Sequence, residues 1–413
     1  MRILWFTNCL LPKAYELFGL RQSYQGGGWM ESQLNALREY YPKVKICIAT
    51  ANFVPHTVKR FDDGVQYICF PYCRRLRQEW IEPMLDEAAA VVRDYCPDLV
   101  HVHGSELFYG LIAEHPTVSC PVAVSLQGLI GPYSAWPAFF GNHTPLEVLR
   151  LQRGLELLKG HGLIPEYLRF QHDAQREHRI LAAIRHVMGR TQWDCDYAMA
   201  VNPALNYYHV GELLRRPFWG ASWSLHNCFR NTIIFTNAGH PRKGADVLLK
   251  AFRIVLKRFP NARLLIAGSI GPADAYGSHI YRQLEEFDER VSLLGTLTPQ
   301  EMVAALLGSH VFVSPSFIDN SPNALCEAQL LGMPVISTYV GGVPSLIKDR
   351  QTGVFAVAGD PSSIAGRIME IFEGDDFATF LGTNGRKFAM QRHDPYTVVN
   401  QLIQAYEAVL GKK

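Results

Sequence analysis

The sequence has no apolar run of the ~20 residues that a membrane-spanning helix needs, and no low-complexity tract. Its N-terminus, MRILWFTNCLLPK, lacks the pattern of a secretory signal, which is charged, then apolar, then rich in small residues. Neither sign of charge dominates, because 40 Lys and Arg face 38 Asp and Glu, for a formal net charge of +2. A nearly neutral chain gives no general reason to expect a nucleic-acid partner. We therefore expect a globular protein that contacts a membrane, if at all, from one side.

The cysteines also lack the pattern of a metal site. The chain has nine of them, scattered without paired ligand spacing, and Cys69 and Cys73 have no matching second pair. An odd number of cysteines and a missing signal sequence both indicate a reducing compartment. We therefore expect a cytoplasmic protein with no zinc site.

The chain of 413 residues exceeds the size at which one core keeps growing, so two domains are expected. Short apolar runs alternate with amphipathic stretches, as in parallel sheets whose strands connect through helices. The predicted strands are RILWFT, VKICIAT, VQYICFP, LVHVHG, PVAVSLQG and HVMGRT in the first half, and TIIFTNAG, ARLLIAG, VSLLGT, HVFVSPS, MPVIST and TGVFAV in the second.

Between the two series lies a segment without clear strand period, near 205–230, where we place the junction. The prediction is an α/β protein with two doubly wound, mostly parallel sheets that face a central cleft. One domain covers 1–210 and the other covers 225–390. A helix in 391–413 follows, and packing back onto the N-terminal domain is one option for it.

Local signals fix two helices of the second half. In TLTPQEM, Thr298 is placed to cap a helix and Glu301 to complete a capping box. In FIDNSPNALCEAQLLGMPVIST, Ser321 is the expected cap, Pro322 the first helical residue and Gly332 the residue past the end.

Two carboxylates flank the start of that second helix. Asp319 lies before the cap, at the carboxyl end of a strand, and Glu327 projects from the second turn. The unpaired N–H groups around Asn323 and Ala324 are a ready receptor for a phosphate. Carboxylates, by contrast, bind hydroxyls, because their oxygens accept hydrogen bonds without donating any. Together these groups suit a nucleotide sugar, which has a diphosphate between two hydroxyl-rich rings.

The stretch DNSPNALCE resembles the signature of retaining glycosyltransferases of the GT-B fold, in particular family 4 (glycosyl transferases group 1). That signature is an acid, seven residues and then Glu, with Asp319 here in place of the usual first Glu. The resemblance implies two Rossmann-like domains. It also implies that Asp319 contacts hydroxyls of the transferred sugar and that Glu327 contacts the ribose hydroxyls.

Other stretches resemble the family in the same order along the chain. NAGHPRKGADVLLKAF resembles its Lys-Gly motif, which implies that Lys243 neutralises the diphosphate and that Arg242 is the only substitute for an arginine common in relatives. QGGGWMESQLNAL resembles its glycine-rich phosphate loop, and LLGTLTPQEM resembles a loop beside the base. With Lys243, Asp319 and Glu327 as the catalytic set, the implied donor-binding residues are Gly26, Gly27, Gly28, Gly239, Arg242, Gly295, Thr296, Pro322, Asn323 and Ala324.

The acceptor side is matched more loosely, through VHVHGSE, VSLQGLIG and VMGRTQWD. These stretches supply His103, Gln127 and Arg190 as acceptor-side candidates. His103 is alternatively a structural residue at a strand end, and Arg190 alternatively pairs with a nearby acid. Relatives often carry His where this chain has Gln127, so no histidine base is assigned. We read Asp194 and Asp196 of DCD as structural.

The resemblance implies transfer of a hexose-type sugar from a nucleotide sugar to a glycan or lipid-linked acceptor, as in surface polysaccharide synthesis. It implies a front-face displacement in which the leaving diphosphate takes the acceptor's proton, so no metal or other cofactor is expected. Two alternatives stay open, which are an epimerase of the same fold and a catalytically silent protein that binds a nucleotide sugar.

The acceptor itself is poorly defined by the sequence. The region 133–177 mixes aromatic and basic residues, and CRRLRQEW adds Arg74, Arg75 and Arg77. One interpretation is a surface that contacts the inner face of a membrane carrying a lipid-linked acceptor. The other, which we favour slightly, is a helical cover with a solvated basic face.

Overall fold

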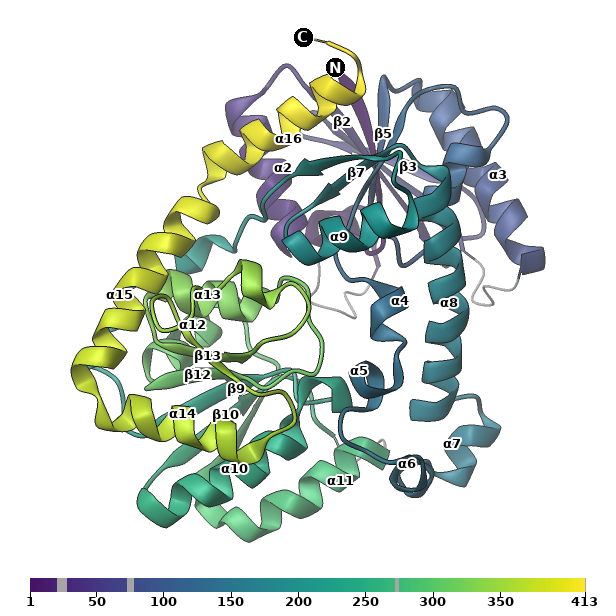
Figure 1. Cartoon of the computed structure of the whole chain (residues 1–413). Coiled ribbons are helices and arrows are strands. Elements are labelled where there is room, and N and C mark those ends of the chain that lie inside the picture. Colours follow the sequence, from purple (N-terminus) through teal and green to yellow (C-terminus); the bar gives the residue numbers. More distant parts are fainter. Residues whose placement is uncertain (21–27, 73–77, 272–274, 413) are drawn as a thin grey trace. The chain divides into compact units, whose positions relative to one another are not determined.

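The structure is a computed structural model that describes residues 1–20, 28–72, 78–271 and 275–412. The chain forms two compact units, each built around one sheet (Figure 1). Unit 1 consists of Met1–Gly131, Asp173–Leu213 and His393–Lys413, and unit 2 consists of Pro132–His172 and Leu214–Arg392. The predicted fold class, an α/β protein with two mostly parallel sheets, is confirmed. That the two sheets face a central cleft stays a prediction.

Unit 1 contains an eight-stranded sheet with the order β3-β4-β2-β1-β5-β6-β7-β8. Every pair is parallel except β3 with β4. The strands are β1 (Arg2–Thr7), β2 (Lys45–Asn52), β3 (Val58–Asp62), β4 (Val65–Pro71), β5 (Leu99–His103), β6 (Val122–Ser125), β7 (His186–Gly189) and β8 (Asn206–His209). The strand order runs outward in both directions from β1 and β5, so the carboxyl ends of these two strands meet where the topology reverses.

Helices cover both faces of this sheet, as the side chains of β1 show. Leu4 and Phe6 point into a core shared with α3, η1 and α8, while Ile3 and Trp5 point into a core shared with α1, α2 and α16. This alternation is the period of two expected of a strand. The helices that cover unit 1 are α1 (Pro12–Leu17), α2 (Gly28–Tyr40), α3 (Gln78–Tyr95), η1 (Phe108–Glu114), α9 (Gln192–Val201) and α16 (Pro395–Val409), together with the later part of α8 (Leu163–Ala183).

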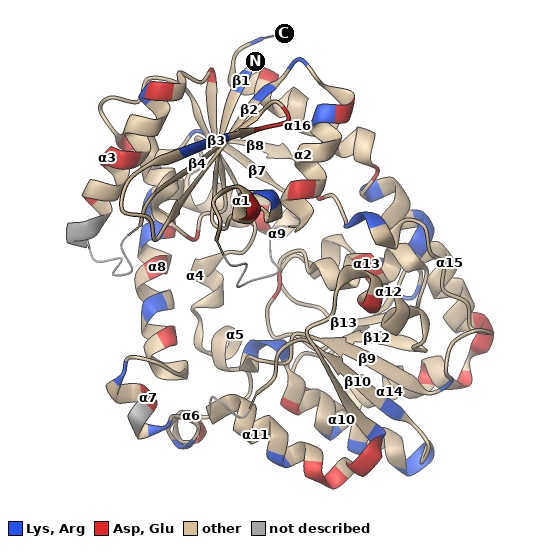
Figure 2. Ribbon diagram, turned by 180° about the vertical axis from the view of Figure 1, so that it is seen from behind, with Lys and Arg blue, Asp and Glu red and all other residues tan. Residues whose placement is uncertain are grey.

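Unit 2 contains a six-stranded, all-parallel sheet with the order β11-β10-β9-β12-β13-β14. Its strands are β9 (Thr232–Thr236), β10 (Arg263–Ala267), β11 (Val291–Gly295), β12 (Val311–Ser314), β13 (Val335–Thr338) and β14 (Val354–Ala356). Here the strand order reverses between β9 and β12. The charged residues lie mainly on the helices and loops, and the strands of both sheets carry few of them (Figure 2).

The helices of unit 2 fall into two sets. One follows strands of the sheet and comprises η3 (Pro241–Lys243), α10 (Ala245–Arg258), α11 (Ala275–Leu284), η4 (Glu285–Arg290), α12 (Pro299–Leu307), α13 (Asn323–Leu331), η5 (Val343–Ser345), α14 (Pro361–Glu373) and α15 (Asp375–Arg392), with η2 (Arg216–Phe218) before β9. The other lies in 132–172 and comprises α5 (Trp136–Phe140), α6 (Pro145–Leu151) and α7 (Gly154–Leu158); α4 (Ile130–Tyr133) and α8 run across the unit boundaries. No helix in the described ranges is long and apolar enough to cross a membrane.

The stretch 132–172 lies in the first half of the sequence but packs with the second half of the chain. The prediction puts it within the N-terminal domain of 1–210, whereas the structure groups it with Leu214–Arg392. The physical reason is that Phe139 and Phe140 are buried in the same core as Ile233 of β9 and Leu248 of α10. The aromatic residues of this stretch therefore turn inward and do not form an exposed surface.

Candidate active site

The predicted catalytic residues lie in unit 2, at the carboxyl ends of β9 and β12. These two strands are parallel neighbours, and the strand order reverses between them. Open α/β sheets bind their ligands in the crevice beside such a switch point. The loop after β9 carries Lys243, and the loop after β12 carries Asp319.

The Lys243 loop ends in a short 3-10 turn, Pro241–Lys243, which His240 caps. The His240 Nδ1 accepts a hydrogen bond of 3.1 Å from the Arg242 N–H. Gly244 follows with φ +73°, and a Cβ built there would lie 2.2 Å from the carbonyl oxygen of Pro315. Only glycine fits this close approach to the loop after β12. The glycine of the Lys-Gly pair is therefore required by the geometry as well as by the motif.

The structure brings Lys243 and Asp319 into direct contact. The Lys243 Nζ lies 2.7 Å from Asp319 Oδ2, and both side chains are largely buried. The Ser316 hydroxyl also donates to Asp319 Oδ2, at 3.4 Å. The Asp319 carbonyl accepts from the Gly342 N–H at 3.0 Å, which ties the loop after β13 to the same place. The cation proposed for the diphosphate and the acid proposed for the sugar thus share one small site.

Helix α13 begins one residue later than predicted. Its N-cap is Pro322, in extended conformation and with no capping side chain, so the prediction that Ser321 caps the helix is wrong. A proline side chain has no acceptor, and so the first amides of the helix stay open. The N–H groups of Asn323 and Ala324 have no hydrogen-bond partner among the described residues. These are the donors that the sequence predicts for a phosphate.

Glu327 is almost fully enclosed, with 2% of its side chain exposed, and it forms a bidentate ion pair with Arg215. Arg215 Nε donates to Oε1 at 2.6 Å, and Nη2 donates to Oε2 at 2.7 Å. The guanidinium also lies 4.8 Å from the centre of the Phe218 ring. Carboxylate oxygens each have two lone pairs, so the two hydrogen bonds from Arg215 do not use all the acceptor capacity of Glu327. The sequence prediction missed Arg215, and the RRP of LLRRPFWG was the only signal for it.

The other donor-side candidates are more dispersed. A Cβ at Gly239 would lie 2.9 Å from the Ser269 carbonyl oxygen, so this position packs tightly against the loop after β10. The Arg242 guanidinium lies 5.7 Å from the centre of the Phe170 ring of α8. Gly295 and Thr296 are exposed at the end of β11, two strands away from β9. Gly28 is the first residue of α2 in unit 1, and Gly26 and Gly27 lie outside the described residues.

In unit 1, His103 ends β5 in a fully enclosed place. Its ring lies 4.6 Å from the Trp5 ring, 5.7 Å from the Trp29 ring and 4.0 Å from the His101 ring. Neither ring nitrogen has a hydrogen-bond partner among the described residues. Burial, helped by the charges of His101 and Arg190, lowers the pKa of His103 well below its usual value. The ring is therefore neutral at physiological pH.

Arg190 pairs with an acid, which is the alternative that the sequence left open for it. Its Nη1 lies 2.9 Å from Glu212 Oε2, and its guanidinium lies 4.6 Å from the centre of the Trp29 ring. Gln127 is half-buried just after β6. Asp194 completes the capping box at the start of α9, which gives it a structural role.

One buried carboxyl was not predicted as a site residue. Glu106 follows β5 at the switch point of unit 1, where its Oε2 accepts from Asn8 Nδ2 at 2.7 Å and its Oε1 from the Gly128 N–H at 3.2 Å. A Cβ at Gly104 would lie 2.0 Å from Glu106 Oε2, so the carboxyl lies directly against the strand end. Burial is the main cause that raises its pKa to about 7. A buried carboxyl with a raised pKa at a switch point of the sheet is a candidate site residue.

No cluster of three or more His, Cys, Asp or Glu side chains among the described residues has the arrangement of a metal site.

Part of the sequence of unit 2 matches a family profile. Residues 225–388 match the profile described as "Glycosyl transferases group 1", and this range contains Lys243, Asp319 and Glu327. The D-inositol 3-phosphate glycosyltransferase of Corynebacterium efficiens is 29% identical over 163 residues, which cover 38% of each chain. The capsular polysaccharide biosynthesis glycosyltransferase CapM of Staphylococcus aureus is 26% identical over 168 residues, 41% of this chain and 43% of that one. The matches thus span less than half the length of these relatives.

The whole chain resembles solved structures in fold. HepE of Anabaena in complex with UDP-glucose superposes with a TM-score of 0.68 at 14% sequence identity, covering 99% of this chain and 100% of that one. At this level of identity the likeness concerns the fold of both units.

Proposed function

We propose that the chain is a retaining, metal-independent glycosyltransferase of family 4. It moves a hexose-type sugar from a nucleotide sugar to a hydroxyl of a glycan or of a lipid-linked acceptor. The observation that carries this proposal is the 2.7 Å contact between Lys243 and Asp319 beside the open amides of α13. The profile match over 225–388 and the UDP-glucose complex of a protein with the same fold support it.

Each group of the site has a role that follows from its chemistry. Lys243 and the amides of Asn323 and Ala324 hold the diphosphate, since a cation and a helix N-terminus both stabilise negative charge. Lys243 has three N–H donors, so it can contact a phosphate oxygen and still donate to Asp319. Asp319 accepts from hydroxyls of the sugar, and Glu327 accepts from hydroxyls of the ribose.

The reaction forms and breaks bonds on one face of the sugar. The bond from the anomeric carbon to the diphosphate oxygen breaks as the bond to the acceptor oxygen forms, and the acceptor proton passes to the leaving diphosphate. No protein nucleophile takes part. Lys243 and the α13 amides stabilise the charge that grows on the diphosphate, and removing one such contact typically costs about a hundredfold in rate or more.

We propose that the protein binds an anionic membrane surface and takes its acceptor there. Helices α6 and α7 expose Leu146, Leu149, Leu157 and Leu158, of which Leu158 is 85% exposed. On α6, Val148 and Leu151 face the core and Leu146 and Leu149 face outward, so the helix is apolar on both sides. Most of the exposed charges between and beside these leucines are basic, with acidic residues at fewer positions (Figure 2). The basic residues are Arg150, Arg153, Lys159 and Arg169.

Leucines and cations together favour a lipid surface over a protein partner, because lipid tails take the leucines and anionic headgroups take the cations. A cytoplasmic enzyme bound at the inner face of the membrane, active in surface polysaccharide synthesis, fits this surface. The name of the CapM relative points to the same process.

A thermal-shift panel of UDP-, GDP- and ADP-sugars tests the donor assignment, because a ligand at 100 times its Kd stabilises the native state by about 2.7 kcal/mol. We expect one base to raise the melting temperature of the wild type, and the Lys243→Ala variant to lose most of that shift. Proton NMR of the reaction without acceptor separates transfer from epimerisation. No shift with any nucleotide sugar would refute the proposal.

A further inference from the structure

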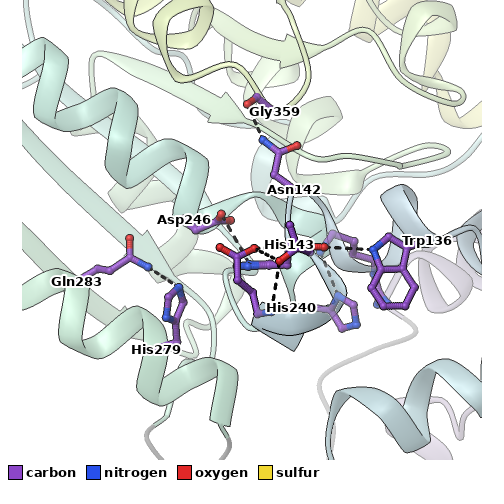
Figure 3. A network of polar contacts seen from close by, with 11 residues as sticks. Trp136, Asn142, His143, His240, Asp246, His279, Gln283 and Gly359 are labelled. Carbon is purple, nitrogen blue, oxygen red and sulfur yellow. Dashed lines mark hydrogen bonds and ion pairs between the residues drawn. The ribbon is translucent and has the colours of Figure 1, made fainter. Parts of the chain in front are cut away.

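The helical stretch 132–172 packs on the loops that carry Lys243 and Asp319 at three places. Figure 3 shows two of the contacts that it makes, Asn142 with Gly359 and His143 with Asp246. None of its residues belongs to the site assigned above. Because it precedes these loops by about seventy residues or more in the sequence, no motif connects the two.

The first contact is made at the cap of the Lys243 loop. The His240 ring meets the Phe139 ring of α5 edge-on, with centres 4.7 Å apart and planes at 88°. Its Nε2 is buried, 3.8 Å from Glu166 Oε1 of α8. Burial, followed by the charges of Arg242 and Lys243, lowers the pKa of His240 well below its usual value. The neutral ring therefore keeps Nδ1 free of a proton, as an acceptor for the Arg242 N–H.

The second contact is made on the loop of Asp319. Phe317 lies two residues before Asp319, and its N–H donates to the Arg242 carbonyl at 2.8 Å. Its ring is packed against two glycines, because a Cβ built at Gly141 would lie 2.7 Å from it and a Cβ at Gly359 would lie 3.0 Å from it. Asn142, next to Gly141, donates to the Gly359 carbonyl at 2.7 Å and holds the two glycines together.

The third contact is made at the start of α10. His143 Nε2 lies 3.8 Å from Asp246 Oδ2, and both side chains are more than nine-tenths buried. Asp246 comes two residues after Gly244, whose left-handed conformation directs the chain from Lys243 into the helix. The stretch 132–172 therefore contacts the Lys243 loop before and after the lysine.

We infer that 132–172 is a positioning clamp for the diphosphate half of the donor site, with the His240–Phe139 contact as its main element. The clamp holds the Lys243 and Asp319 loops at a fixed separation. Lys243 can therefore bind the diphosphate without a free-energy cost for rearranging the loops. The inference gives the clamp no contact with the nucleoside or the sugar. This inference rests on the proposed function, and it assigns the affinity for the diphosphate to residues that do not touch it.

The test compares a nucleoside with its diphosphate by titration calorimetry, using uridine and UDP, or guanosine and GDP if that base binds the wild type. In His240→Leu the cap acceptor is lost, and we expect a Kd for the diphosphate about tenfold higher, with the Kd for the nucleoside unchanged. Phe139→Ala should likewise raise the Kd for the diphosphate and leave the Kd for the nucleoside unchanged. His240→Asn supplies a capping acceptor again and should stay within about threefold of the wild type.

The matched control is Leu168→Ser, an exposed leucine of the same stretch, which should change neither Kd. If Phe139→Ala does not fold, Phe139→Leu keeps most of the apolar volume and removes the ring edge. Equal losses for nucleoside and diphosphate, or no loss in His240→Leu, would overturn the inference and leave the proposed function standing. Failure of the wild type to bind either diphosphate would overturn both.

Discussion

Replacing Arg215 by methionine is expected to destabilise the protein by an amount that depends on pH. Methionine keeps an apolar side chain against the Phe218 ring, so the change removes mainly the charge and the two hydrogen bonds to Glu327. Glu327 stays behind in a place where 2% of its side chain is exposed. The variant therefore has a carboxylate that is buried without its cation.

Two estimates bound the size of the effect. Removing one partner of a buried ion pair typically costs about 3–5 kcal/mol. The carboxyl can avoid its lone charge by taking up a proton, and for an ordinary glutamate this costs about 4 kcal/mol at pH 7 and about 1 kcal/mol at pH 5. Because Arg215 itself is 30% exposed, the lower part of the range applies. We expect a loss of about 3 kcal/mol at pH 7 that shrinks to about 1 kcal/mol at pH 5.

Urea denaturation followed by tryptophan fluorescence at pH 5, 6, 7 and 8 measures this loss. The matched control is the double variant Arg215→Met with Glu327→Gln, which has no charge at either position and should recover most of the loss at pH 7. A loss below about 1 kcal/mol at pH 7, or one that does not change with pH, would show that the pair is not a closed ion pair in solution.

Three further outcomes are expected. Lys243→Ala should lower turnover about a hundredfold or more in a transfer assay, and unchanged turnover would count against its diphosphate role. Glu106 has a raised native pKa, so its contribution to stability is full below pH ~4.5 and is lost as pH rises through about 7. Glu106→Gln does not titrate, so in chemical denaturation its stability relative to the wild type should rise by up to about 3 kcal/mol between pH 5 and pH 8. A difference in stability that stays constant over this pH range would contradict the expectation. Leu157→Asp with Leu158→Asp should abolish flotation with anionic liposomes, whereas Phe380→Asp, on α15 and as exposed as Leu157, should not. Flotation of both variants would rule out the leucine surface.

The strands were the most predictable part of the fold, because central strands buried on both faces leave continuous apolar runs in the sequence. All twelve predicted strands are present in the structure. The two that were missed, β3 and β8, lie at the edges of the first sheet with exposed residues on both faces, so their sequences VKRFD and NYYH carry no apolar period.

Cap signals predicted one helix start correctly and another with an error of one residue. The capping box of Thr298 and Glu301 is present as predicted, and Gly332 ends α13 with φ +87°. At Ser321 the same reasoning was wrong by one residue, because Pro322 takes an extended conformation and becomes the cap itself.

In the candidate site, the motifs singled out candidate residues but not the partners of their side chains. The contact between Lys243 and Asp319 joins positions 76 residues apart, and the pairing of Arg215 with Glu327 joins positions 112 apart. Such contacts depend on which strands become neighbours, and local patterns do not encode that. For the same reason the packing of 132–172 on the site loops was not predictable from its position in the sequence.

The division of the chain has a consequence for how the protein is made. The Trp5 indole N–H of the first strand and the His101 ring both hydrogen-bond the Tyr406 hydroxyl of α16, at 2.9 Å and 2.7 Å. Unit 2 similarly combines 132–172 with 214–392. During synthesis, neither half can close its core when its own first strands emerge. Apolar surfaces of both halves therefore stay uncovered during synthesis until 393–413 has emerged for unit 1 and 214–392 for unit 2, and such surfaces favour aggregation while they are exposed.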